Sequence, residues 1–486
     1  MLISSEPMSA RSPAVFVRPQ RWGRGRVSAM AVGKSSGPMP RHSRLTGRHG
    51  LCSVVRIVWS DFPTVRRDAW QVLPAARAPS HPSLHDPALS CPAPFVAASA
   101  AGRAAPRRQS QWRSLRSMPE LVRGVLTMRR DGNGLLVDPE HMFRSHGAIA
   151  SVPRGLIREY GLVDGARLEG TVQSNHQAAR VMHDVRSVCG LSPDQFARRT
   201  PFDRLVSIAP NKRYHIGRSA KMTMRIMDLF CPIGKGTRGL IVSPPKAGKT
   251  TILEDLANAV LDEEPSARVI ALLVDERPEE VTTFRRTTKA EVWASNMDQS
   301  YADHVTLVSL ALNHIRCELE CGHDVMVLCD SITRMARAFN VEGGGSGRTM
   351  TGGLDASAMQ IPRRFFGMAR NIEGGGSVTV LATALVDTGS RMDNLIFEEF
   401  KGTGNSEIVL DRKLAELRIF PAINVSASGT RREEELYTPF EMKMVRRLRR
   451  VLADRQPAEV ITHLVSAMRK AKTNEDFLAN LPGADE

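Results

Sequence analysis

The stretch that decides the fold runs from residue 239 to residue 251 and reads GLIVSPPKAGKTT. Its first five residues form an apolar run typical of a buried strand, and residues 249–263 repeat apolar side chains at helical spacing. A loop between a strand and the start of a helix directs backbone N–H groups toward one point, where a polyphosphate can bind. The stretch therefore predicts a phosphate-binding loop.

The residues of this loop suggest how a nucleoside triphosphate is held. Lys249 is expected to reach the β and γ phosphates, and Thr250 to place its hydroxyl on Mg²⁺. The loop departs from the general G-x-x-x-x-G-K-[ST] pattern because Ser243 stands at the first glycine. A turn that only caps a helix is the alternative, which the agreement of strand, loop and helix disfavours. The residues expected to bind ATP here are Pro245, Lys246, Ala247, Gly248, Lys249, Thr250 and Thr251.

The chain on both sides of the loop alternates strand and helix patterns. Apolar runs at 239–243, 269–275, 325–330 and 377–386 predict buried parallel strands, and residues 249–263 and 300–321 predict amphipathic helices between them. The pattern predicts an α/β, RecA-like P-loop ATPase domain over residues 201–486.

Two of these strands end in carboxylates. VMVLCD ends in Asp330, which we expect to hold the Mg²⁺ shell beside Thr250. VIALLVDER ends in Glu276 and Arg277 at the strand edge where open α/β sheets bind ligands. Glu276 is the candidate to orient and deprotonate the attacking water, with Arg277 close to the phosphates. A lone DER would more often be a solvated turn, but here three features converge on one edge.

The segment before the ATPase domain, residues 118–175, lacks the alternation of strands and helices. Residues 118–175 contain short apolar segments broken by turns, among them GVLTM, the DGNG turn at 131–134 and ARLEGTV. This pattern predicts a small five-stranded barrel of OB or cold-shock type that binds RNA. Residues 176–200 are expected to be a polar connector.

The charge along the chain is very uneven. The net charge is +16, but residues 1–117 carry seventeen Arg and one Lys against four acidic residues. Residues 118–486 have a net charge of only +2, so most of the positive charge lies in the leader, residues 1–117. The net charge is therefore no argument that residues 118–486 bind RNA.

Residues 1–117 show neither helical nor strand periodicity. Three interpretations stay open: a disordered basic arm, an Arg-rich organelle transit peptide, or an upstream stretch wrongly included in the reading frame. We favour the last, with Met118 as the true start, because the excess of Arg over Lys and the four tryptophans resemble translated GC-rich DNA. Peptides of the native protein that map before Met118 in mass spectrometry would contradict this.

The seven cysteines are scattered and odd in number, unlike a disulfide framework, so we expect a reducing, cytoplasmic location. No apolar run approaches the roughly eighteen residues of a membrane span, and we expect no membrane partner. His314, Cys317 and Cys321 share one helical face, yet the same stripe includes Leu310. A core face is therefore a simpler interpretation than a zinc site.

Several further segments, in this order, resemble the transcription termination factor Rho family. They are SPPKAGKT, LLVDERPEEV, CDSITRMARAFN, GRTMTGGLD, RRFFGMARNIE, ATALVDTGSRMD, EEFKGTGN and RIFPAINVSASGTRREEEL. The match is dense from Met222 to Leu436, and we expect it to extend to the C-terminus. A rotary-type ATPase subunit and a DNA-directed RecA relative are the rival enzymes, and DERPEEV with the two glycine-rich loops argues against both.

The resemblance implies a homohexameric ring with ATP sites between subunits. Arg431 matches the arginine finger, Arg418 a second interfacial arginine, and Phe420 the residue that stacks on adenine. Two loops of each subunit would grip single-stranded RNA in the central channel, which flexible glycines, short hydroxyls and cations suit. The matching loop residues are Arg348, Thr351, Gly352 and Gly353 in the first loop, and Thr388, Gly389 and Arg391 in the second.

Two departures from the family bear on mechanism. The barrel turn reads DGNGLL, with Asn133 and Leu135 where the family has two phenylalanines that stack pyrimidines. Stacking contributes about 1 to 3 kcal/mol per base, so we expect weaker RNA loading on the barrel. Leu417 replaces a basic residue before Arg418, which bears on how ATP hydrolysis is coupled to RNA.

The resemblance thus implies an ATP-dependent RNA translocase or helicase that uses Mg²⁺ and terminates transcription by releasing nascent RNA from RNA polymerase. Transcription elongation factors are candidate partners. The alternative from a different class is a non-catalytic RNA-binding ring that nucleotide only assembles. The set formed by Lys249, Glu276 and Asp330 disfavours that alternative.

Overall fold

The structure is a computed structural model that describes residues 120–143, 147–174, 179–343, 353–355 and 357–482. The predictions made for the leader at 1–117 lie outside these residues. Within the described ranges, no helix has the length and apolar character to cross a membrane.

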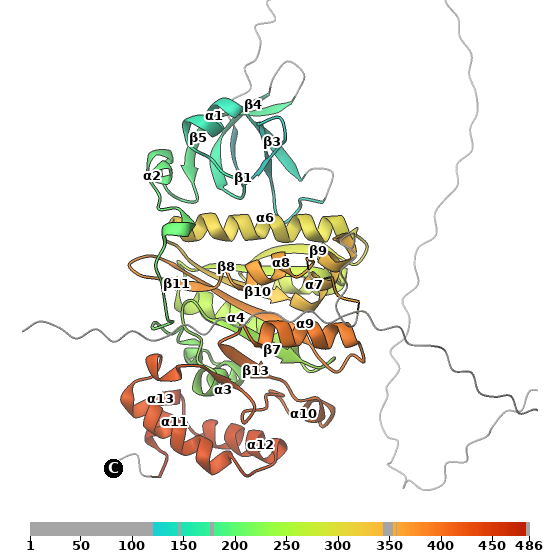
Figure 1. Ribbon diagram of the computed structural model, residues 1–486. Coiled ribbons are helices and arrows are strands. Elements are labelled where there is room, and N and C mark those ends of the chain that lie inside the picture. The colour runs from blue at the N-terminus through green and yellow to red at the C-terminus, as the bar shows by residue number, and fades with distance from the viewer. Residues whose placement is uncertain (1–119, 144–146, 175–178, 344–352, 356, 483–486) are drawn as a thin grey trace, which may run out of the picture. The chain divides into compact units, whose positions relative to one another are not determined.

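The first part of the described chain is a closed five-stranded barrel with strand order β1-β2-β3-β5-β4 (Figure 1). The inward side chains of its strands, such as Leu126, Leu136 and Leu168, are fully buried and form its core. The predicted barrel is therefore confirmed. Its elements are β1 (Glu120–Met128), β2 (Gly134–Val137), β3 (Ala148–Val152), α1 (Arg154–Glu159), β4 (Arg167–Ser174) and β5 (Arg180–Val188).

The end of the barrel differs from the prediction, because the expected connector at 176–200 holds β5 and the short helix α2 (Pro193–Ala197). The buried residues of β5 are Met182, Val185 and Val188, spaced by three rather than two. The register between β4 and β5 shifts twice, and each β-bulge adds a residue that breaks the alternation of a regular strand. These bulges hide the strand from a search for strict alternation.

The second part is an α/β domain built on a sheet of order β14-β13-β7-β12-β10-β8-β9, in which β13 to β9 run parallel. β11 pairs with β12 and with β6. The four predicted strands are confirmed as β7, β8, β10 and β12. The strands of this domain are β6 (Ser207–Ile208), β7 (Arg238–Ser243), β8 (Arg268–Glu276), β9 (Glu291–Asn296), β10 (Asp324–Asp330), β11 (Arg370–Ile372), β12 (Ser377–Leu385), β13 (Ser406–Val409) and β14 (Gly429–Thr430).

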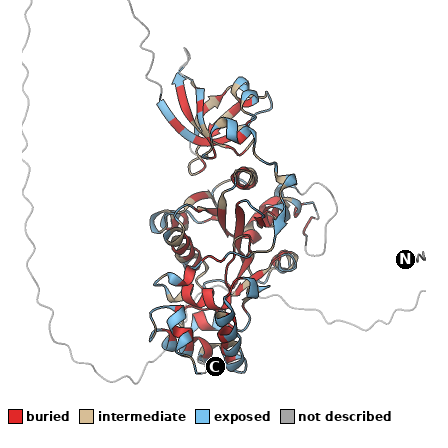
Figure 2. Ribbon diagram, turned by 90° about the vertical axis from the view of Figure 1, so that its left-hand side faces the viewer, coloured by how far each residue is buried: buried red, intermediate tan, exposed pale blue. Residues whose placement is uncertain are grey.

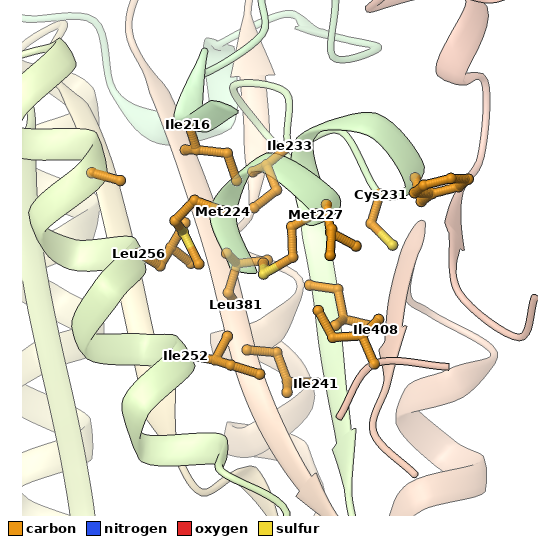
Figure 3. Close-up of a cluster of buried hydrophobic side chains, with 14 of the residues drawn as sticks. Ile216, Met224, Met227, Cys231, Ile233, Ile241, Ile252, Leu256, Leu381 and Ile408 are labelled. Carbon is orange, nitrogen blue, oxygen red and sulfur yellow. The ribbon is translucent and has the colours of Figure 1, made fainter. Parts of the chain in front are cut away.

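Helices cover both faces of this sheet. Alternate side chains of each buried strand enter two different cores: Ile241 packs with α3, α4 and α5, whereas Leu240 packs with α6 to α9. Figure 3 shows Ile252 and Leu256 of α4 packed over Ile241 and Leu381 of the sheet. The helices are α3 (Met222–Phe230), α4 (Lys249–Glu263), α5 (Pro278–Thr287), α6 (Tyr301–Glu320), α7 (Ile332–Glu342), α8 (Gln360–Phe366), α9 (Arg391–Lys401) and α10 (Arg412–Glu416), with 3-10 turns at Phe202–Arg204, Ile216–Arg218 and Glu433–Glu435.

Three helices end the described chain: α11 (Pro439–Leu452), α12 (Pro457–Met468) and α13 (Asn474–Ala479). Their apolar faces join the core of α3 and α4 through residues such as Met444, Ile461 and Leu478. Figure 2 shows the buried interior and the exposed outer faces of these helices. Arg225 of α3 donates hydrogen bonds to the carbonyl oxygens of Met468 and Thr473, which fixes this end to the domain.

The helical face that could have suggested a zinc site is a core face, as predicted. His314 and Cys317 of α6 are buried. The Nδ1 atom of His314 hydrogen-bonds the carbonyl oxygen of Gly165 at 2.9 Å, and its Nε2 atom lies 3.2 Å from Arg167. Both ring nitrogens therefore have protein partners.

Candidate functional site

The predicted phosphate-binding loop joins β7 to α4, because β7 ends at Ser243 and α4 begins at Lys249. Gly248 has a φ of +90°, a left-handed conformation that glycine adopts without steric cost. A cleft of about 670 Å³ opens at this loop. The predicted site residues that line it are Pro245, Lys246, Gly248, Lys249, Thr250, Thr251, Glu276, Arg277 and Thr388.

At the base of the cleft, one lysine meets two buried carboxylates. The Nζ atom of Lys249 lies 2.6 Å from an oxygen of Asp330 and 3.5 Å from an oxygen of Glu276. Glu276 is 2% exposed and Asp330 is 1% exposed. Asp330 also accepts a hydrogen bond of 2.8 Å from the Thr383 hydroxyl, so its orientation is fixed from β12. The structure thus brings together three residues that lie up to 81 positions apart in the sequence.

Burial and charge act in opposite directions on these groups. Burial raises the pKa of Glu276 above its ordinary value, and the Lys249 ammonium only partly offsets this effect. For Lys249, burial lowers the pKa, but the charges of Asp330 and Glu276 outweigh it and the net pKa is raised. Lys249 is therefore a permanent cation, while Glu276 is a carboxylate with a raised proton affinity, which suits a general base.

A β-bulge turns Glu276 into the cleft. Between β8 and β9 the register shifts, so that three steps from Leu273 to Glu276 face two steps from Ala294 to Asn296. Asp275 within the bulge has a φ of +55°, a strained conformation for a residue with a side chain. The extra residue changes which side of the strand Glu276 faces.

Buried polar groups hold the bulge in place. The Ser295 hydroxyl accepts a hydrogen bond of 3.4 Å from the backbone N–H of Asp275, and it lies 2.8 Å from Nδ1 of His304. The Nε2 atom of His304 is 3.8 Å from the carboxylate of Asp275. Burial lowers the pKa of His304, against the charge of Asp275, so the neutral ring is favoured.

Sequence reasoning missed Arg334 in the helix that follows Asp330. Its guanidinium donates to the carbonyl oxygen of Asp275 and, at 3.2 Å, to Oε1 of Glu276. The available signal was its place one turn after Ser331, which caps α7 and points that turn toward the cleft. Glu280 was also missed, although its carboxylate accepts a hydrogen bond of 3.4 Å from the Thr250 hydroxyl.

The structure does not bring Arg418, Phe420 and Arg431 to this cleft. Among the described residues, none of the three lines it, and all three are exposed, Phe420 by 51%. Arg431 lies instead in a separate cavity of about 540 Å³ beside β13 and β14. Arg418 has a φ of +60°, which marks a turn after α10. These side chains are therefore not part of the chain's own nucleotide cleft.

The two predicted RNA loops are described unequally. Arg348, Thr351 and Gly352 lie outside the described residues, and only Gly353 of the first loop is placed, with its carbonyl accepting from Asn340. In the second loop Gly389 has a φ of +76°, and Arg391 is exposed at the start of α9.

The second loop is tied to the cleft on one side and to α7 on the other. Thr388 lines the cleft and donates a hydrogen bond of 2.6 Å to the buried carboxylate of Asp393. Arg337 of α7 binds the same carboxylate through two nitrogens, at 2.8 and 2.6 Å. The loop is therefore held against the helix that follows Asp330.

The polar groups of the barrel turn at 131–134 form hydrogen bonds within the barrel. Asp131 accepts hydrogen bonds from the backbone and side chain of Asn133, and the side-chain oxygen Oδ1 of Asn133 accepts one from the backbone N–H of Arg154. Leu135 is half-buried against apolar neighbours. The positions that differ from the family thus form a closed polar turn and an apolar contact rather than two exposed rings.

Comparison with known proteins agrees with this geometry. The nucleotide-binding domain of the ATP synthase alpha/beta family matches residues 223–430. Transcription termination factor Rho of Streptomyces lividans is 47% identical over 67% of this chain and 47% of its own length. The Rho factor of Mycobacterium tuberculosis is 45% identical over 68% of this chain and 56% of its own length. The matched part thus spans about half the length of these relatives.

A shorter relative is covered more fully. The Rho factor of Aquifex aeolicus is 43% identical over 364 residues, which make up 74% of this chain and 84% of that protein. A solved ATPase of a bacterial type III secretion system is 21% identical over 63% of this chain with a TM-score of 0.47, a likeness too weak to add to the assignment. With the nucleotide-binding fold, the barrel and this degree of identity, the chain belongs to the transcription termination factor Rho family.

Proposed function

We propose that this protein is an RNA-dependent ATPase that moves along single-stranded RNA and terminates transcription by releasing nascent RNA from RNA polymerase. The observation that carries the proposal is the convergence of Lys249, Glu276 and Asp330 on one cleft whose rim includes Thr388 of the second RNA loop. One cleft thus joins a hydrolytic site to a predicted RNA contact.

In the proposed reaction, Lys249 and the loop N–H groups hold the β and γ phosphates of ATP. Glu276 accepts the proton of the attacking water, and its raised pKa makes it a stronger base than an exposed glutamate. Arg334 keeps the Glu276 carboxylate oriented through its contact at 3.2 Å. Arg277 lines the same cleft, where it would contact the phosphates.

The residues around Thr250 fit a Mg²⁺ ion, because this ion prefers oxygen ligands. The Thr250 hydroxyl contacts the Glu280 carboxylate and the Lys249 ammonium, and Lys249 in turn contacts the carboxylates of Asp330 and Glu276. Thr250 and Asp330 are the residues that would hold the ion. The ion would supply neutralising charge at the β and γ phosphate oxygens.

We also propose a homohexameric ring, which the positions of the two arginines support. Arg418, Phe420 and Arg431 are exposed and do not line their own cleft, so a neighbouring subunit could present them to it. Arg431 would then neutralise charge that develops on the transferred phosphoryl group, and Phe420 would stack on adenine. Transcription elongation factors are candidate partners, and the proposed function leads us to expect a cytoplasmic location.

The test of this function is release of RNA from stalled transcription complexes. The full chain with ATP should free labelled transcripts, and Glu276→Gln or a non-hydrolysable ATP analogue should abolish the release. Release that occurs equally without hydrolysis would favour the non-catalytic ring, in which nucleotide only assembles the oligomer. Absence of release with intact ATP turnover would contradict termination while leaving the ATPase in place.

A further inference from the structure

The charge of the folded part is concentrated in one segment. Residues 443–472 carry nine Lys and Arg against two acidic residues, whereas residues 118–442 together have a net charge of −1. The first third of this segment lies in α11, whose other side is apolar and buried through Met442, Val445 and Leu448. The basic residues of α11 therefore gather on its outer side.

Four of these cations form one exposed face, which we call the α11 basic face: Lys443, Arg446, Arg447 and Arg450. Their spacing of three, four and seven residues places them on one side of a helix, over a length of about 10 Å. In the described part of the chain, none of the four side chains makes an ion pair or hydrogen bond. The charge of Arg446 acts on Glu433, but the ion-pair partner of Glu433 is Arg449, at 3.3 Å.

A simple solvated surface does not explain this composition. Like charges four residues apart repel one another along a helix, and α11 contains two such pairs, Lys443 with Arg447 and Arg446 with Arg450. Solvated surfaces usually intersperse both signs of charge. The accumulation of one sign indicates an anionic partner that neutralises it.

An exposed aromatic residue stands beside these cations. Phe440 is 41% exposed, three residues before Lys443 and seven before Arg447 on the same side of the helix. Cations with an adjacent exposed ring are the usual means of binding single-stranded nucleic acid, because cations contact phosphates while the ring stacks on a base. An acidic protein surface would account for the cations but not for the ring.

We propose that the α11 basic face binds the phosphate backbone of single-stranded RNA, with Phe440 stacking on a base. The inference rests on the proposed function, which makes RNA the polymer that this protein handles. Such a site would offset the missing aromatic pair at the barrel turn, where Asn133 and Leu135 offer no exposed ring. Binding there would be indifferent to sequence and strongly dependent on salt.

The test measures binding of the full chain to a fluorescent single-stranded RNA by anisotropy over a series of salt concentrations. The variant with Lys443→Gln, Arg446→Gln, Arg447→Gln and Arg450→Gln should bind about tenfold or more weakly. Its plot of log affinity against log salt should be shallower by about 3, since each phosphate contact on a single strand contributes roughly 0.7. Phe440→Ala should weaken binding about fivefold or more and leave this slope unchanged.

The matched control conserves the charge. The variant with Arg446→Lys, Arg447→Lys and Arg450→Lys should keep the salt slope of the wild type. If the fourfold variant does not fold, Lys443→Gln with Arg447→Gln and Arg446→Gln with Arg450→Gln each test half of the face, with half the change in slope. A wild-type slope in the Gln variants would overturn the inference and point to an acidic protein, whereas a wild-type chain that binds no RNA would overturn the proposed function itself.

Discussion

At the scale of single residues, the site depends on how one lysine is shared between two buried carboxylates. Lys249, Glu276 and Asp330 come from three different elements, and Arg334 and Thr383 each orient one of the carboxylates. The sequence predicted the first three because a strand that ends in a charged residue is a recognisable pattern. Arg334 and Thr383 carry no such pattern, since their roles depend on which strands become neighbours in the sheet.

The first prediction concerns pH. Burial raises the pKa of Glu276, so as pH falls this residue takes up a proton earlier than an ordinary glutamate would. A protonated Glu276 cannot accept the proton of water, and kcat should decline on the acid side at a pH above the ordinary glutamate range. A pH profile of kcat measures this decline. A profile that is flat down to the range of an exposed glutamate would contradict the role of Glu276 as a base.

The second prediction concerns Lys249. Lys249→Met should abolish nucleotide binding and also lower the free energy of unfolding by about 2 to 3 kcal/mol, because it leaves two buried carboxylates without their cation. Denaturant unfolding of the wild type and the variant measures the difference. Lys246→Met is the control, since Lys246 is exposed in the same loop and should change stability by less than about 0.5 kcal/mol. Equal free energies of unfolding for the two variants would show that Lys249 does not stabilise the buried carboxylates of Glu276 and Asp330.

At the scale of elements, irregularities in strands decide both the barrel and the site. In β5 the bulges place buried residues three positions apart instead of two. The sequence pattern therefore predicts a polar connector where the structure has a strand. The bulge before Glu276 had no visible trace in the run VIALLVDER, although it directs the carboxylate into the cleft. Regular strands such as β7 and β10 were predictable because an uninterrupted apolar run needs no knowledge of neighbouring strands.

The third prediction tests the bulge. His304→Ala removes the buried ring that supports Ser295 and the strained Asp275, so Glu276 should lose its fixed position. We expect kcat to fall about tenfold with little change in KM for ATP, because loose positioning of a general base costs rate rather than binding. Ser309→Ala on the same helix is the control, and its kcat should equal that of the wild type. A rise in KM at constant kcat would contradict a positioning role for His304.

At the scale of the whole molecule, the residues of the proposed nucleotide site lie in two sets on different surfaces of the chain. The cleft at Lys249 holds the phosphate-binding and hydrolytic groups, while Arg418 and Arg431 stand exposed elsewhere. In the proposed ring, neighbouring subunits would bring these two sets of residues together, and the loop at Thr388 and Arg391 would connect each cleft to RNA. The sequence indicated this division only through the family resemblance, because motifs give the residue types but not the surface on which each one lies.

The measurement that tests the central claim most directly is steady-state ATP hydrolysis by the full chain, alone and with single-stranded RNA or single-stranded DNA. The account predicts that RNA stimulates turnover well beyond DNA, and that Glu276→Gln abolishes the stimulated turnover while ATP still binds. Turnover that is indifferent to RNA would contradict the account, because the cleft would then be a working ATPase that is not coupled to the loop at Thr388 and Arg391.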